Sequence, residues 1–99
     1  MIPALAAFVR ARDAVQATFD ALTANETRMD ALAVEAAALP LGSPERDGLY
    51  ARIDIGLAAN RVLLGTLGPK IAAESAARNA LHEGDYIASR AMTAPAEAA

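Results

Sequence analysis

The sequence contains no cysteine and no tryptophan, and it has only one histidine, one lysine, two phenylalanines and two tyrosines. The absence of cysteine excludes disulfide bonds, thiolate metal sites and cysteine nucleophiles. A single histidine leaves little material for a metal site or for acid–base catalysis. Long apolar runs are missing too, because uncharged segments such as residues 36–44 are far shorter than the roughly 20 apolar residues that span a membrane.

Alanine dominates the composition, with 27 of 99 residues, and the larger apolar side chains together number another 27. A chain of this length forms one domain, and its core must be built from few bulky side chains. The formal charge of −3 gives no overall attraction to nucleic-acid backbones. The first nine residues carry no basic side chain, unlike the start of a signal peptide. We therefore expect a cytoplasmic protein, or one incorporated into a particle assembled in the cytoplasm.

The first half of the chain has apolar residues at alternating intervals of three and four, which predicts a helix over about residues 3–38. Thr23 to Glu26 matches a capping box, which would allow a break there. We expect one continuous helix instead, because the apolar spacing keeps its phase from Leu22 to Met29. We call the stripe along which one helix is expected to pack against another its seam, and the seam has two positions in every seven residues. One position holds Phe8, Val15, Leu22, Met29 and Ala36, and the other holds Leu5, Arg12, Phe19, Glu26 and Ala33.

Residues 39–44 contain two prolines and a glycine, which end one helix and begin another. Ser43 is a good N-cap, and Pro44 suits the first position of the following helix. A connection this short makes the two flanking helices antiparallel neighbours.

The second helical pattern begins at about residue 44, and Gly68-Pro69 interrupts it, since proline cannot donate its N–H and clashes with the preceding turn. Two alternatives follow: one kinked helix, or a helix over about 44–67 joined to a third helix over about 69–83. Residues 85–99 are expected to form a short turn and then a flexible tail. The expected seam of this half holds Tyr50, Ile53, Leu57, Asn60, Leu64, Leu67, Ile71, Glu74, Arg78 and Leu81.

The fold expected from these patterns is an all-α antiparallel helical hairpin with a shorter third C-terminal helix and coiled-coil-like packing, in a single domain over residues 1–84. Asn60 stands alone as a polar residue in an apolar part of the seam. It either fixes register or oligomeric state, or lies at the edge of a wide face in contact with water.

No arrangement of residues in the sequence predicts catalysis. His82 and Glu83 lack the second histidine that a zinc helix needs four residues on, where Tyr86 stands. Residues 65–70 lack the spacing of a phosphate loop. Residues 44–83 hold five positive and five negative charges, so no basic face for DNA is expected. We expect no enzyme, no cofactor and no metal site.

The second helix is apolar over more than one stripe, because Ile55, Val62 and Leu63 lie off its expected seam. Such a surface is typical of a protein contact. The expected function is a non-catalytic structural or adaptor protein that acts by helix–helix association, either with itself or on a larger assembly such as a phage-type particle or a multi-subunit complex. The alternative is a small nucleic-acid-associated helical regulator. The predicted interface comprises Leu57, Asn60, Leu64, Leu67 and Ile71.

In size and alanine content the chain resembles the small secreted partners of actinobacterial type VII systems. Those proteins carry a Trp-x-Gly turn and a tail motif with an acidic residue four positions after a tyrosine. This chain has no tryptophan, and Arg90 follows Tyr86 at that distance. The sequence therefore identifies no family.

Overall fold

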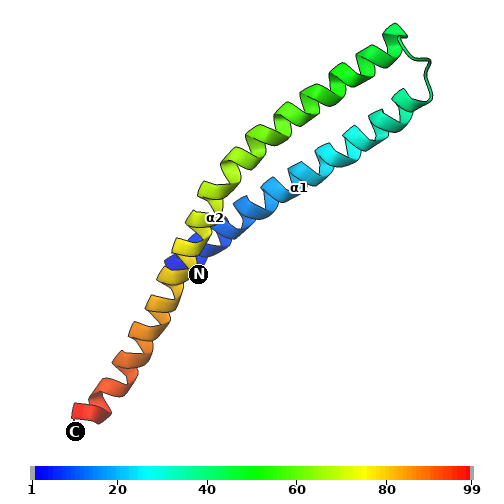
Figure 1. Ribbon diagram of the computed structural model, residues 1–99. Helices are drawn as coiled ribbons and strands as arrows, with labels where there is room; N and C mark the ends of the chain where they lie inside the picture. Colours follow the sequence, from blue (N-terminus) through cyan, green and yellow to red (C-terminus); the bar gives the residue numbers. More distant parts are fainter. Residues whose placement is uncertain (1, 99) are drawn as a thin grey trace. The chain divides into compact units, whose positions relative to one another are not determined.

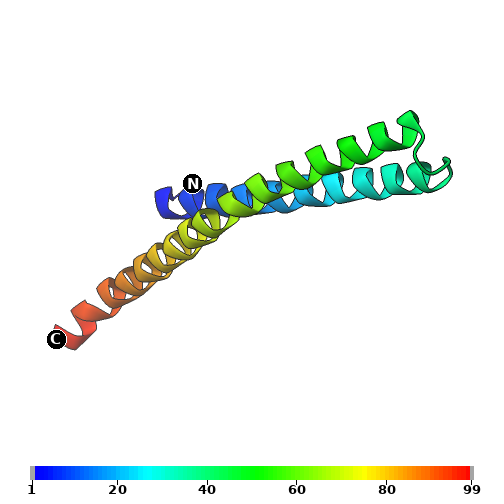
Figure 2. The same cartoon turned by 45° about the horizontal axis from the view of Figure 1, so that its top comes forward.

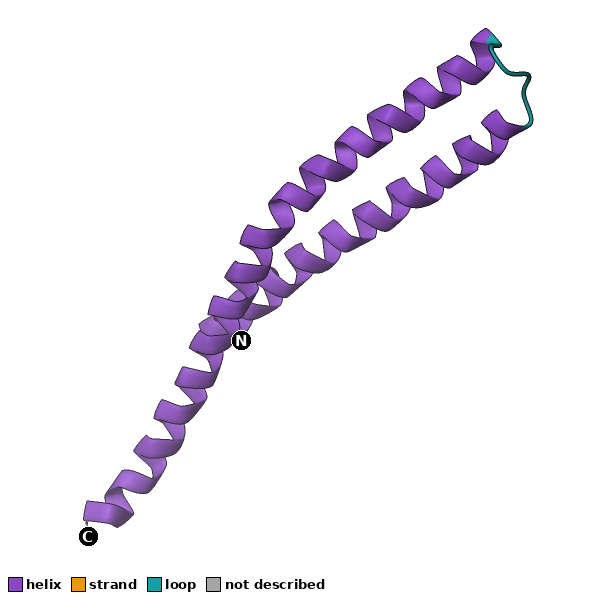
Figure 3. Ribbon diagram, in the orientation of Figure 1, coloured by secondary structure: helices purple, strands orange, loops and turns teal. Residues whose placement is uncertain are grey.

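The computed structural model describes the backbone of residues 2–98 and the side chains of residues 2–85. It contains two long helices, α1 (Pro3–Ala37) and α2 (Pro44–Ala98), joined by a short loop, and no strand occurs within the described backbone (Figure 1, Figure 3). The expected all-α fold is confirmed, and so is a single unbroken helix in the first half of the chain.

The helix ends near the loop follow from local chemistry. The Oγ atom of Ser43 accepts a hydrogen bond from the backbone N–H of Arg46 at 3.2 Å, as an N-cap does. Pro44 begins α2, where its missing N–H would have had no partner. Gly42 has a φ of 76°, a left-handed conformation that glycine adopts without steric cost. These three residues explain why the chain reverses its direction here.

The residues expected to form a third helix, 69–83, lie within α2, which runs unbroken through Gly68-Pro69. The structure therefore shows two long helices and does not show a separate third one. Where a short turn and a tail were expected over residues 85–99, the backbone of α2 continues as a helix to Ala98, and the flexibility of this segment stays a prediction.

The chain consists of two compact units. We call Gln16–Gly68 the loop unit, because it includes the loop, and Met1–Val15 with Pro69–Ala99 the terminal unit. In the loop unit, α1 and α2 run side by side in opposite directions, as two views agree (Figure 1, Figure 2). This confirms the expected antiparallel hairpin.

The buried core of the loop unit lies beside the loop. Leu32, Ala36 and Leu49 form a cluster of buried side chains, against which the half-buried Leu39 and Ile53 pack. Arg46 connects the first turn of α2 to the loop, since its Nη1 donates a hydrogen bond to the carbonyl oxygen of Leu39 at 3.2 Å. The burial of apolar side chains on both helices holds this end of the hairpin together.

In the terminal unit, Phe8 is half-buried, and two guanidinium groups lie close to its ring. Arg12 of α1 lies 5.9 Å from the ring centroid and Arg78 of α2 lies 5.8 Å from it, both within cation–π range. Arg78 also pairs with Glu74 one turn earlier. Both arginines therefore lie near the same aromatic ring.

The residues of the loop unit that face between the helices differ in part from the expected seam. One position of each helix agrees: Leu22, Met29 and Ala36 are buried or half-buried, as are Ile53, Asn60 and Leu67. The other seam position of each helix is wrong by one residue. At each expected residue of this position, the residue directly before it in the sequence is the less exposed of the two. The second positions in the structure hold Thr18, Asn25 and Leu32 on α1, and Leu49, Gly56 and Leu63 on α2.

Candidate functional site

The shift of the seam leaves a row of large apolar side chains of α2 exposed. Leu57 keeps 43% of its surface exposed, Leu64 keeps 56% and Ile71 keeps 46%. Of the five residues predicted as a protein interface, Leu57 and Leu64 lie outside the seam of the loop unit, and Ile71 belongs to the terminal unit. The other two, Asn60 and Leu67, are half-buried.

The loop unit has two sides, and the residues that flank its seam identify them. Arg28 directly precedes a seam residue of α1, and Arg52 and Ala59 directly precede seam residues of α2; all three line one cavity. In antiparallel helices, equivalent flanking positions lie on the same side of the pair. Residues that directly follow the second seam positions therefore lie on the opposite side. In the loop unit these are Phe19, Glu26 and Ala33 on α1, and Tyr50, Leu57 and Leu64 on α2.

We call Phe19, Leu57 and Leu64 the apolar stripe of the loop unit. Phe19 is exposed, although the sequence pattern placed it inside the seam. Tyr50 extends the same side toward the loop, and its exposed ring lies 5.5 Å from the Arg46 guanidinium, which also donates a hydrogen bond to the tyrosine oxygen. Glu26 is the acidic residue among these six flanking positions. The stripe and the other flanking positions on this side therefore form a mainly apolar surface with one negative charge.

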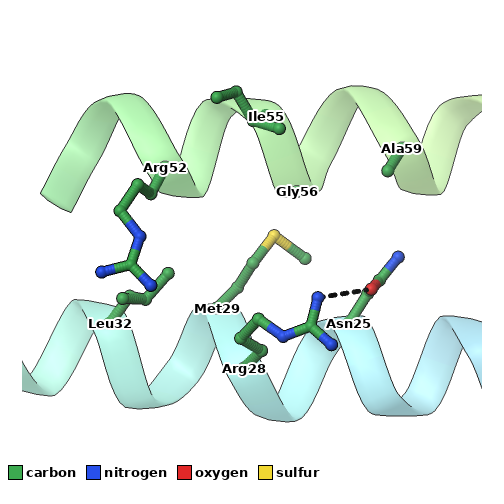
Figure 4. Close-up of a pocket in the computed structure, with 8 residues that line it drawn as sticks. All are labelled: Asn25, Arg28, Met29, Leu32, Arg52, Ile55, Gly56 and Ala59. Carbon is green, nitrogen blue, oxygen red and sulfur yellow. Dashed lines mark hydrogen bonds between the residues drawn. The ribbon is translucent and has the colours of Figure 1, made fainter. Parts of the chain in front are cut away.

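The opposite side of the loop unit carries a shallow cavity of about 320 Å³ (Figure 4). Gly56 is one of the residues that line it. A Cβ atom at that position would lie only 2.8 Å from Cγ of Met29, whose side chain fills the space next to the glycine. Arg28 and Arg52 lie at its rim, and sequence reasoning singled out neither. The cavity is lined by Asn25, Arg28, Met29, Leu32, Arg52, Ile55, Gly56 and Ala59.

Asn60 has a partner inside the hairpin. Its Oδ1 accepts a hydrogen bond of 3.0 Å from Nδ2 of Asn25, and Asn25 Oδ1 accepts a longer one, 3.4 Å, from Arg28. Both asparagines are half-buried. Of the two alternatives for Asn60, the register role is favoured, because a slip of either helix would separate the two amides and leave each facing apolar neighbours.

We expect the two asparagines to be energetically coupled. Replacing either one by alanine, Asn25→Ala or Asn60→Ala, should remove the same hydrogen bond. The double variant should therefore lose less stability than the sum of the singles, by about 0.5–1.5 kcal/mol. Urea unfolding of the four proteins, followed by circular dichroism at one protein concentration, measures this coupling. Additive losses would show that the pair does not contribute to stability.

The described residues offer no metal site, since nowhere among them do three His, Asp or Glu side chains gather closely enough to hold an ion. His82 and Glu83 are exposed on α2. Within the described part of the chain, neither helix has a stretch long and apolar enough to cross a membrane. Two pairs of exposed apolar side chains seven residues apart remain on α2 of the loop unit: Leu57 with Leu64 in the apolar stripe, and Ile55 with Val62 on another face.

Comparisons with protein-family models, with curated proteins and with solved structures found no match to this chain.

Proposed function

We propose that this chain is a non-catalytic structural or adaptor protein that acts by helix–helix association through the apolar stripe, either with itself or on a larger protein assembly. The observation that carries the proposal is the exposure of Leu57 and Leu64 at an interval of seven residues, with Phe19 on the same side. An interval of seven repeats the spacing of the seam itself, so a further helix can pack along the stripe in the manner of a coiled coil.

The hydrophobic effect supports the same conclusion. Leaving a Leu side chain in water instead of burying it forgoes roughly 1.5–3 kcal/mol. Single exposed apolar residues are common on soluble proteins, but rows of them mark contact surfaces. Leu57 and Leu64 are 43% and 56% exposed, so covering them with another helix would recover about half of this free energy for each, and it requires no chemistry beyond apolar packing.

The experiment compares two double variants of matched composition. Leu57→Ser with Leu64→Ser alters the stripe, whereas Ile55→Ser with Val62→Ser alters two exposed residues with the same spacing on another face of α2. Size-exclusion chromatography of extracts from cells that produce each form measures the size of the complexes. We expect the natural chain and the Ile55/Val62 variant to migrate in complexes larger than one chain, and the Leu57/Leu64 variant to migrate alone.

Circular dichroism of each purified variant confirms that it has retained its helices. If the folded stripe variant remains in the same complexes as the natural chain, the stripe is not the association surface. If the natural chain itself migrates as a single free chain in the extract and also when purified, the proposed function is wrong.

A further inference from the structure

We infer that the cavity beside Gly56 binds a small amphiphilic anion, a carboxylate on a short apolar chain, and that Arg52 holds the carboxylate. The residues that line the cavity come from both helices and all belong to the loop unit. They lie on the side opposite the apolar stripe, so this site does not depend on the proposed function. The volume of about 320 Å³ is at the lower end of the roughly 300–1,000 Å³ of small-molecule sites, which favours a short ligand.

The charge of the cavity is opposite to that of the whole chain. Two arginines and no acidic residue line it, whereas the chain has a formal charge of −3. Neither Arg28 nor Arg52 forms an ion pair with any residue whose side chain the structure describes. The residues three and four positions from each arginine on its own helix are all uncharged, so no carboxylate lies within helical reach. A bound anion would therefore meet two cations without competition from a neighbour on either helix.

The two arginines differ in what they already contact. Arg28 donates a hydrogen bond, although a long one of 3.4 Å, to Oδ1 of Asn25. Arg52 makes no hydrogen bond to the described part of the chain, and its side chain extends from α2 toward Leu32 at one end of the cavity (Figure 4). Its planar guanidinium can therefore donate two parallel hydrogen bonds to a carboxylate.

The rest of the cavity suits an apolar chain. Met29, Ile55 and Ala59 contribute apolar side chains to its lining. The lining extends over residues 25–32 of α1 and residues 52–59 of α2, which is about 10 Å along each helix axis. A short alkyl chain that starts at the carboxylate can lie along this length, and the hydrophobic effect favours its burial against these side chains.

The test is a titration of the full-length chain, labelled with ¹⁵N, with octanoate, in which NMR follows the backbone amide signals. We expect saturable binding with a dissociation constant of about 1 mM or below, and the largest signal shifts within residues 25–32 and 52–59. Acetate has the carboxylate without the chain, and octyltrimethylammonium has the chain with the opposite charge. Each should bind more weakly than octanoate by about tenfold or more.

Two matched pairs of variants locate the site. Arg52→Gln removes the partner of the carboxylate and should weaken octanoate binding by about tenfold. Arg61→Gln removes the same charge at an exposed position outside the cavity lining and should have little effect. Ala59→Leu places a larger side chain in the cavity and should also weaken binding, whereas Ala58→Leu alters an exposed residue outside the lining and should not. All four positions are exposed, and circular dichroism checks that each variant keeps its helices.

Three results would overturn the inference. The absence of saturable binding up to about 10 mM octanoate would show that the cavity does not take this ligand. Equal binding of octanoate and octyltrimethylammonium would show that the arginine charges do not select the ligand. Binding that neither Arg52→Gln nor Ala59→Leu weakens would take place elsewhere on the chain. None of these results affects the proposed association through the apolar stripe, which the variants of Leu57 and Leu64 test separately.

Discussion

Replacing Leu32 by alanine is expected to destabilise the hairpin by about 2–5 kcal/mol, the largest loss that we predict for a single side chain. Leu32 is only 6% exposed and belongs to the buried cluster with Ala36 and Leu49. Because single domains are stable by only about 5–15 kcal/mol, this loss would unfold a large share of the molecules near body temperature. Thermal and urea unfolding at one fixed protein concentration measure the change.

Val34→Ala is the matched control, because Val34 lies two residues away on the same helix and is 74% exposed. Its substitution should change stability by no more than about 0.5 kcal/mol, since alanine is also the better helix former. Equal losses in the two variants would mean that the cluster beside the loop is not the core of the hairpin.

The second large effect concerns Pro69 and has the opposite sign. We expect Pro69→Ala to stabilise the protein by about 3 kcal/mol, because α2 runs unbroken through this position and proline inside a helix removes a hydrogen bond and clashes with the preceding turn. Pro44→Ala should have little effect, since Pro44 occupies the first position of α2. Thermal unfolding of both variants measures the difference.

This comparison also decides between the two alternatives that the sequence leaves open for Gly68-Pro69. In a continuous helix the proline is destabilising, and its removal raises the melting temperature. As the first residue of a separate third helix it would be as harmless as Pro44. A Pro69→Ala variant no more stable than Pro44→Ala would therefore support the joint between two helices.

The sequence was sufficient to predict α1, the loop, the start of α2 and one position of each seam, but it led us to expect a third helix where α2 continues without a break. Ser43, Pro44 and the loop prolines act through local backbone chemistry, so no tertiary information was needed there. The second seam position could not be obtained in the same way. Phe19 and Leu57 are more apolar than Asn25 and Gly56, and the pattern therefore favoured them as the inward-facing residues.

Two contacts across the hairpin reverse that choice, and neither is visible in a single helix. Asn25 is acceptable inside because Asn60 accepts its hydrogen bond, and Gly56 is acceptable because Met29 of the other helix fills the space beside it. A residue that looks unsuitable for a core when its own helix is considered alone becomes suitable through its partner on the other helix. The same effect explains why Leu57 and Leu64 are exposed while Asn60 and Leu67 are partly covered.

The position of the buried cluster beside the loop has a consequence for the order in which the hairpin folds. The contact between Arg46 and Leu39 closes seven residues of chain, whereas the contact between Asn25 and Asn60 closes 35. Closing the longer segment first would cost about 1.4 kcal/mol more in chain entropy than closing the shorter one. Folding is therefore expected to start at the loop, with Leu32, Ala36 and Leu49 as an early nucleus, and to proceed along the two helices toward the asparagine pair. Such local contacts place the hairpin among the chains that fold within microseconds to milliseconds.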